Sequence, residues 1–162
     1  MQKVGEKLAE WAKSESNTQD VDAIGRSAFN RFYYASFLLT REMLGNFDSQ
    51  LMKARHASIP EILNGSIKKK IQRVSRSRKN MISQKDVSQA FDSLNALSSL
   101  LQDAYKVRCD ADYCPEKKII RNGVKGEIFL EEKKLSSASN WQRHAERYVK
   151  IIQRVGKNLG LV

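Results

Sequence analysis

The sequence contains few of the residues that cross-link or interrupt a fold. It has only two cysteines and two prolines in 162 residues. Cys109 and Cys114 do not form a CxxC motif, and two thiols in a chain of this length favour a reducing cytoplasm over a disulfide framework. The scarcity of proline leaves long stretches free to be helical. The two histidines, His56 and His144, are too few and too far apart in sequence for a zinc site, so we expect no metal and no cofactor.

Long apolar runs and the common phosphate-binding loops are also missing. No run approaches the roughly 18 apolar residues of a membrane span. The first 15 residues carry acids and lack a continuous apolar core, which argues against a secretory signal. The sequence has no GxxxxGK[ST], GxGxxG or GxSxG motif. With 41% hydrophobic and 29% charged residues, the composition is that of a globular protein. We therefore expect residues 1–162 to form a single cytoplasmic domain that does not enter a membrane.

Acidic residues are outnumbered by basic ones. Lys and Arg number 29 against 18 Asp and Glu, a net charge of +11. Such an excess favours polyanionic partners, although many proteins are basic merely for solubility. The densest cluster is KKKIQRVSRSRK at 68–79, with seven basic residues and no acid. A polyanion contact and a solvated face explain this run about equally well. The candidate nucleic-acid-binding residues are Lys68, Lys69, Lys70, Arg73, Arg76, Arg78 and Lys79.

The spacing of apolar residues predicts an all-α fold, a bundle of four to five helices. Apolar residues recur at helical spacing over 4–14, 21–44, 87–105 and 141–159. The segment 21–44 is apolar nearly all round, so its helix is buried centrally or shared with a partner chain. Gly45 and Asn46 should end this helix. Ser83 and Asp86 resemble a capping box before the third of these segments. Residues 113–134 are irregular, and 127–130 could form a short strand or a packed loop.

Arg108 is the first candidate for chemistry. The apolar seam at 94, 97, 101 and 104 continues to position 108, where an arginine stands. A guanidinium at the end of a buried seam is costly unless it is paired or contacts a ligand. Asp112, four residues later, could pair with it. The alternative is a structural arginine that caps the helix end and pairs with this aspartate.

Arg31 and Tyr34 form the second candidate. They are three residues apart in the apolar segment 21–44 and therefore share one edge of the predicted helix. In the commoner structural situation, the stem of Arg31 lies on apolar surface and Tyr34 is a core aromatic. His56 is a further candidate for catalysis, although a lone histidine in a loop is more often ordinary surface.

Three short motifs resemble the HEPN family (higher eukaryotes and prokaryotes nucleotide-binding domain). Residues 30–35, Asn-Arg-Phe-Tyr-Tyr-Ala, are similar to the family's Ser-Arg-x-Tyr-Tyr-Ala stretch. His56, followed by Ile59 and Pro60, resembles the start of the family's next helix. Residues 108–113, Arg-Cys-Asp-Ala-Asp-Tyr, are similar to the Arg-x-x-Ala-Asp-Tyr pattern of a bacterial subgroup. The last helix fits the closing helix of the family, so the resemblance covers residues 20–160.

This resemblance implies a helical bundle that is commonly dimeric. Many family members are metal-independent ribonucleases of toxin–antitoxin or phage-defence systems, and an Arg-x4–6-His motif from each subunit meets in one cleft. Histidine can deprotonate the ribose 2′-hydroxyl, and arginine can stabilise charge on the phosphate. In this chain Tyr113 and Cys114 stand where that histidine would be. Carrying the motif over gives Arg108 with Asp112 and Tyr113 but no general base, because a tyrosine with a pKa of about 10 is a poor base at neutral pH.

Two functions follow as interpretations. The first is a HEPN-like ribonuclease-type toxin or effector that cleaves RNA without metal at a dimer cleft, with catalytic candidates Arg108, Asp112, Tyr113, Arg31, Tyr34 and His56. Its partners would be RNA, a second copy, and an antitoxin or a nucleotidyltransferase-type protein. The alternative is a non-catalytic helical adaptor or accessory subunit that binds a protein partner or nucleic acid.

Overall fold

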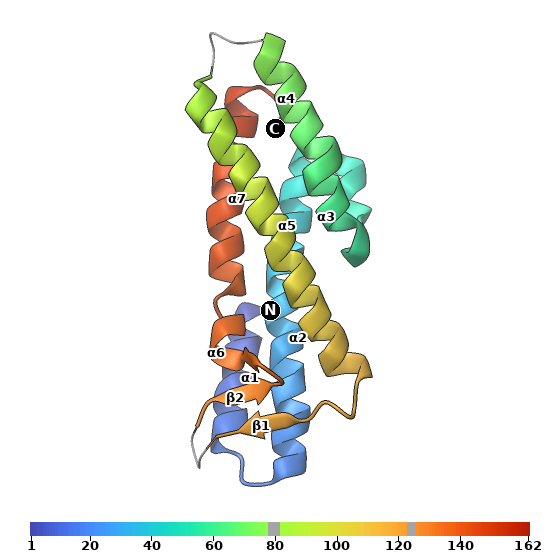
Figure 1. The fold of residues 1–162 in the computed structure, drawn as a ribbon, viewed down its shortest axis with the longest axis vertical. Helices are drawn as coiled ribbons and strands as arrows, with labels where there is room; N and C mark the ends of the chain where they lie inside the picture. The colour runs from blue at the N-terminus through green and yellow to red at the C-terminus, as the bar shows by residue number, and fades with distance from the viewer. Residues whose placement is uncertain (78–81, 123–125) are drawn as a thin grey trace. The chain divides into compact units, whose positions relative to one another are not determined.

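The chain divides into two compact units. A computed structural model describes residues 1–77, 82–122 and 126–162. The first unit comprises Met1–Ser36 and Asp103–Gln142, and the second comprises Phe37–Gln102 and Arg143–Val162. Two 30-residue helices, α2 (Thr18–Phe47) and α5 (Gln84–Tyr113), contribute residues to both units (Figure 1). The assignment of residues 1–162 to a single domain stays a prediction.

The expected fold class is confirmed, because the described chain is mostly α-helical. The helices of ten residues or more among the described residues are α1 (Gln2–Ser14), α2, α4 (Lys68–Ser77), α5 and α7 (Trp141–Asn158). The shorter elements are η1 (Ser49–Lys53), η2 (His56–Ser58), α3 (Ile59–Ile62), the π-helical η3 (Leu63–Ile67) and α6 (Leu135–Ala138). In the described part of the chain, no helix combines the length and the apolar character that crossing a membrane requires.

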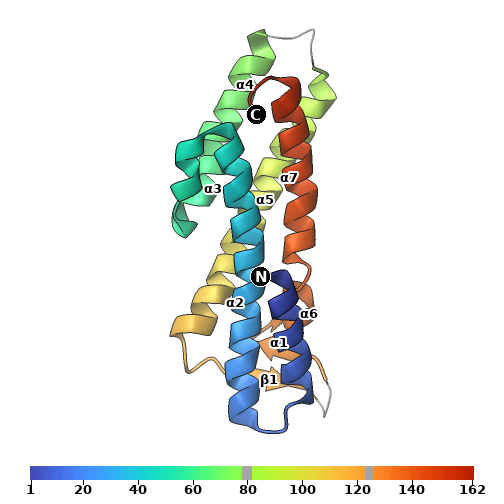
Figure 2. The same ribbon diagram turned by 180° about the vertical axis from the view of Figure 1, so that it is seen from behind.

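The first unit packs α1, the first part of α2 and the last part of α5 around a hydrophobic core that is mostly aliphatic. Phe29 and Phe32 of α2 are fully buried there. Helix α1 lies beside α2 (Figure 2), and a Cβ atom at Gly5 would lie 2.7 Å from the ring of Phe32. Glycine at this position therefore allows the close approach of the two helices.

The irregular segment expected before the last helix contains a small antiparallel sheet in the order β1–β2–β3. Its strands are β1 (Ile119–Arg121), β2 (Ile128–Leu130) and β3 (Lys133–Lys134). The strand alternative for 127–130 is thus the observed one. Ile119 pairs with Leu130, and Ile128 is fully buried. The sheet therefore closes one side of the core of the first unit.

The second unit contains the remaining parts of α2 and α5 with α7 and the elements from η1 to α4. Ser83 caps α5, since its Oγ accepts from the backbone N of Asp86 at 3.1 Å and donates to the carboxylate of Asp86 at 2.7 Å. The stop expected at Gly45 and Asn46 is wrong by a few residues, because α2 continues to Phe47. The last carbonyl of α2, that of Phe47, accepts from Nζ of Lys70 at 2.7 Å.

Candidate functional site

A polar and aromatic cluster lies on two helices of the first unit, and we call it the Arg108 cluster. Helix α2 supplies positions 30, 33 and 34, which share one face because they are three and four residues apart. Helix α5 supplies positions 105, 108, 112 and 113 in the same way. The members of the Arg108 cluster are Asn30, Tyr33, Tyr34, Tyr105, Arg108, Asp112 and Tyr113.

An ion pair within one helix fixes the centre of the Arg108 cluster. Nη2 of Arg108 lies 2.6 Å from Oδ2 of Asp112, and their side chains are 15% and 23% exposed. The other carboxylate oxygen of Asp112 accepts a hydrogen bond from the amide of Asn30 on α2. The pairing expected from the four-residue spacing is therefore present, and Asn30 extends it to a second helix.

Two buried polar atoms beside this ion pair are unsatisfied. Among the described residues, Nε of Arg108 and Oδ1 of Asn30 have no hydrogen-bond partner. One atom is a donor and the other an acceptor, and both belong to side chains that hold Asp112. Buried polar groups without partners cost stability, and such exceptions in a fold call for an explanation.

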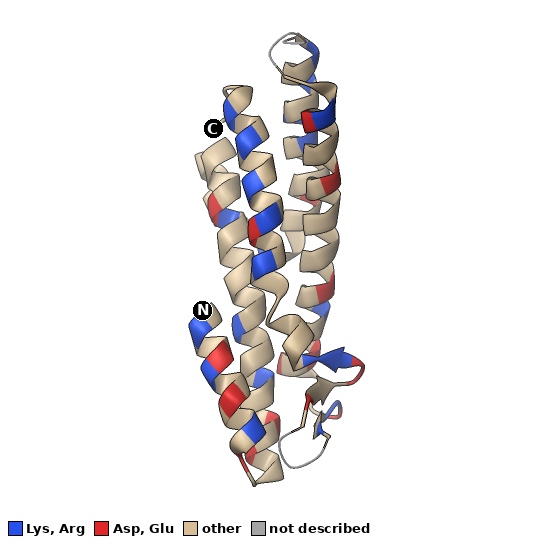
Figure 3. Cartoon of the chain, turned by 90° about the vertical axis from the view of Figure 1, so that its left-hand side faces the viewer, with Lys and Arg blue, Asp and Glu red and all other residues tan. Residues whose placement is uncertain are grey.

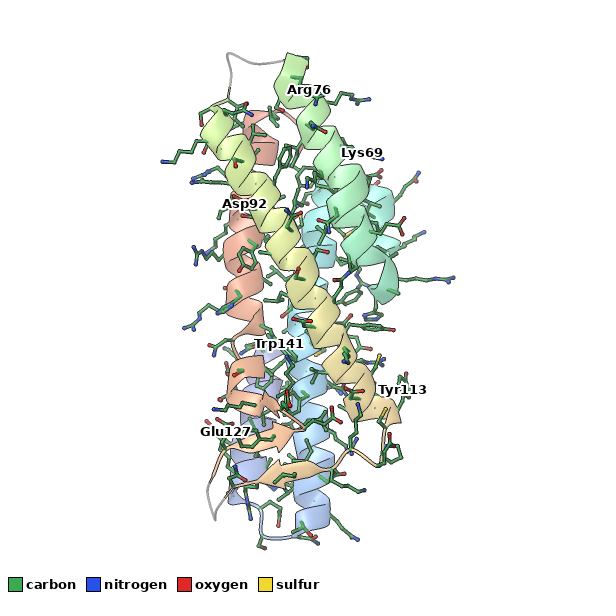
Figure 4. All side chains as sticks on the ribbon, viewed as in Figure 1. Lys69, Arg76, Asp92, Tyr113, Glu127 and Trp141 are labelled. Atoms are coloured by element: carbon green, nitrogen blue, oxygen red, sulfur yellow. The ribbon has the colours of Figure 1, made fainter. Side chains whose placement is uncertain are left out.

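Three tyrosines of the cluster contact one another, and a fourth packs on the guanidinium of Arg108. The rings of Tyr33 and Tyr105 have centroids 5.8 Å apart, and Tyr34 meets Tyr33 edge-on at 5.6 Å. The guanidinium carbon of Arg108 lies 5.2 Å from the ring centroid of Tyr113. Tyr113 lies at the end of α5 (Figure 4) and is 69% exposed. The guanidinium is thus covered on one face by a ring that water reaches freely.

The surroundings of Arg108 keep its guanidinium charged. Burial alone lowers the pKa of Arg108, but a hydrogen bond with Tyr113 and the charge of Asp112 outweigh it, so the pKa is raised. Burial raises the pKa of Tyr33. A hydrogen bond with Cys109 raises the pKa of Tyr105. At neutral pH the charged guanidinium of Arg108, paired with Asp112, therefore lies in a cluster where Tyr33 and Tyr105 keep their protons.

The remaining catalytic candidates lie elsewhere. Arg31 is exposed, and its Nη1 lies 3.9 Å from the sulfur of Met1. It makes no ion pair among the residues described. His56 belongs to the second unit, where its ring stacks on Phe37 with centroids 3.8 Å apart. Of the six predicted catalytic residues, the structure brings Tyr34, Arg108, Asp112 and Tyr113 into one cluster.

The basic run divides into two groups. In the first group, Nζ of Lys70 donates to the last carbonyl of α2. Nζ of Lys68 lies 3.4 Å from Oδ1 of Asn95 and 5.5 Å from the ring centroid of Phe91. Three basic residues of α4 are exposed, namely Lys69, Arg73 and Arg76. They are four and three residues apart and so share one face of α4. Arg78 and Lys79 lie outside the described residues.

Asn30 is the functional candidate that the sequence interpretation missed. Its contact with Asp112 joins positions 82 residues apart. The available signal was its place next to Arg31, three and four residues before Tyr33 and Tyr34 on the same helix face. Helical spacing alone could have included it in the candidate set.

Comparison with protein-family models, with curated proteins and with solved structures finds no match. Within the described ranges, no three histidine, cysteine, aspartate or glutamate side chains gather as a metal ion would require.

Proposed function

We propose that this chain is a HEPN-like protein that acts on RNA, as a ribonuclease-type toxin or effector of a bacterial toxin–antitoxin or phage-defence system. The observation that carries the proposal is the unsatisfied donor on Arg108 together with the unsatisfied acceptor on Asn30, on two side chains that both hold Asp112. A ribonucleotide supplies a match for both, because its phosphate oxygens accept hydrogen bonds and its 2′-hydroxyl donates one.

In the proposed reaction Arg108 binds the scissile phosphate. Asp112 and Asn30 hold the guanidinium in place, so little reorganisation is needed as charge develops on the phosphate. Oδ1 of Asn30 orients the 2′-hydroxyl toward that phosphate. Tyr113 covers one face of Arg108 and is exposed, so its ring can rotate away when RNA enters. No metal takes part in any of these steps.

The cluster contains no ready general base. The tyrosines Tyr33 and Tyr105 hold their protons, and the carboxylate of Asp112 is engaged by Arg108 and Asn30. We therefore propose slow or conditional cleavage in a symmetric dimer, where the second copy completes the cleft. The edge of α2 around Arg31 and Tyr34 is the proposed contact between copies. An antitoxin or a nucleotidyltransferase-type protein is the proposed partner that controls it.

The same absence of a base favours a second function. A charged arginine without a general base beside it is suited to binding a phosphate without cleaving its ester. In this alternative the protein is a non-catalytic adaptor or accessory subunit that binds nucleic acid or a protein partner.

RNA cleavage in the presence of a chelator separates the two functions. Purified protein is incubated with a labelled RNA and EDTA, alongside Arg108→Ala and a control, Lys106→Gln. Lys106 is exposed on the same helix, so the control removes one charge without touching the Arg108 cluster. Cleavage by the wild type and by Lys106→Gln, but not by Arg108→Ala, supports the ribonuclease. Binding without products supports the adaptor, and equal cleavage by all three proteins contradicts a role for Arg108.

A further inference from the structure

Helix α7 carries a straight row of cations, which we call the α7 stripe. It consists of Arg143, Arg147, Lys150, Arg154 and Lys157. The steps of four, three, four and three residues keep all five within an arc of about 80° around the helix. At 1.5 Å per residue the stripe is about 21 Å long. Figure 3 shows it as a column of blue on the helix that leads to the C-terminus.

The charges of the α7 stripe are largely unneutralised. All five residues are exposed. Arg154 pairs with Asp86 at 3.1 Å and remains 55% exposed, whereas the other four make no ion pair among the residues described. Residues 141–158 contain a single acid, Glu146. Because α7 buries Ala145, Val149, Ile152 and Val155 on another side, the stripe is held straight by the core of the second unit.

A hollow of about 340 Å³ opens beside the N-terminal half of the stripe. It is lined by Arg143, His144, Arg147 and Tyr148. The lining thus comprises two guanidiniums that are four residues apart on α7 and two rings that are also four residues apart. The hollow therefore contains guanidiniums, which bind phosphate, and aromatic rings, on which a nucleic-acid base can stack.

We infer that the α7 stripe binds a single-stranded polynucleotide, with phosphates along the cations and a base in the hollow against Tyr148. A strand that rises about 3.4 Å per nucleotide presents roughly six phosphates over this length, which matches five cations in a row. An acidic peptide would use the charges but not the rings. In a duplex the bases are stacked inside, so the rings would have nothing to bind. The site goes beyond the proposed function, since it concerns another surface and requires no cleavage.

A paired substitution tests whether position or merely charge matters. Arg143→Gln with Arg147→Gln removes two cations from the stripe. The matched control is Lys3→Gln with Lys7→Gln, which also removes two exposed helical cations four residues apart, on α1. The probe is a fluorescent 12-nucleotide oligouridylate, with oligothymidylate as a second arm, titrated at several salt concentrations. Circular dichroism checks that each variant is folded.

The expected result is a smaller salt dependence in the α7 variant alone. Its slope of log K against log salt should fall by about 1.4, because each lost phosphate contact of a single strand contributes about 0.7. Tyr148→Leu should weaken binding and leave the slope unchanged, since it removes a stacking ring and no charge. Binding of the deoxy strand as well as the ribo strand also supports the site, because the backbone charge is common to both.

Three outcomes would overturn the inference. The first is an equal loss of affinity in the α1 control, which would mean that net charge alone is sensed. The second is loss of selectivity for a single strand. It would show as a duplex of the same length that binds as tightly, or as polyglutamate of equal charge that displaces the oligonucleotide. The third is an affinity that Tyr148→Leu leaves unchanged. None of these measurements depends on RNA cleavage, so the ribonuclease proposal can fail while the α7 stripe holds.

Discussion

The first unit holds three of its four arginines among hydrogen-bond acceptors, whereas the second unit leaves most cations of α4 and α7 exposed. Arg26 and Arg121 are partly buried and donate to backbone carbonyls, and Arg108 pairs with Asp112. On α7, only Arg154 has an ion pair among the described residues. The net charge of +11 therefore mixes two kinds of cation. Those that fix helix ends stabilise the fold, and those without partners are available to a polyanion.

The largest effect is expected from removing Arg26. Its guanidinium lies 2.8 Å from Asp22 and donates to the carbonyl of Ala111 at 2.9 Å in the last turn of α5. Arg26→Met keeps the apolar stem but leaves these acceptors without the cation. We expect the free energy of unfolding to fall by about 3 kcal/mol, the lower end for breaking a buried pair. Urea unfolding measures it, and the exposed Arg147→Met should change it by less than about 0.5 kcal/mol.

The same pair predicts how stability depends on pH. Burial alone raises the pKa of Asp22, but the hydrogen bonds from Arg26 and from the backbone of Ile119 outweigh it, so the pKa is lowered from its ordinary 3.8. An acid with a lowered native pKa stabilises the fold above its unfolded pKa and loses this contribution as pH falls through the native value. Stability should therefore fall below about pH 4. Asp22→Asn should remove part of that fall, and the exposed Asp92→Asn should not.

A smaller loss of stability is expected at Arg108, together with a larger loss of function. The two ion pairs are about equally exposed, but Arg26 also donates to a backbone carbonyl of α5, whereas Asp112 keeps its hydrogen bond from Asn30 in Arg108→Ala. We expect about 1–2 kcal/mol less stability. Arg108→Lys keeps the charge but loses the planar fork that binds phosphate through two hydrogen bonds. Thermal unfolding beside an RNA assay separates the roles. Full activity in a folded Arg108→Ala protein would remove the Arg108 cluster from the mechanism, and a variant that does not fold would make the residue structural.

Contacts between near neighbours in sequence were predictable. The apolar spacing gave the long helices, and the ion pair of Arg108 with Asp112 followed from a step of four residues. Ser83 and Asp86, three residues apart, gave the cap of α5. In each case the geometry of one helix turn decides which side chains meet, so the sequence pattern already contains the answer.

Contacts between distant residues were not predictable in this way. Asn30 meets Asp112 across 82 positions, and Arg26 caps a helix that ends 87 residues later. Strands of two or three residues are too short to show alternation, so the antiparallel sheet remained one of two alternatives. The basic run looked uniform in sequence, yet Lys70 is used to cap α2 while Lys69 is exposed. Tertiary packing decides these roles, and the spacing of apolar residues in the sequence does not reveal how the helices pack.

That difference between neighbouring lysines can be measured. Lys70→Met removes the hydrogen bond to the carbonyl of Phe47 and a charge at the C-terminal end of α2. We expect a loss of about 1 kcal/mol in the free energy of unfolding. Lys69→Met, one position away and exposed, is the control and should have almost no effect on stability. Similar losses in both variants would contradict the division of the basic run.

The smallest effect on stability is expected from replacing the exposed cations of α4, although the same change should weaken binding to RNA. Replacing Lys69, Arg73 and Arg76 with glutamine changes only exposed side chains, so each substitution should alter stability by less than about 0.5 kcal/mol. If this face of α4 contacts RNA, the salt slope for a single strand should fall by about 2, since each phosphate contact contributes about 0.7. The control replaces three exposed lysines of the first unit, Lys3, Lys7 and Lys106. An unchanged slope in the α4 variant would remove the basic run from the binding surface. The exposed face of α4 would then serve solubility, and the α7 stripe would be left as the row of cations that binds the strand.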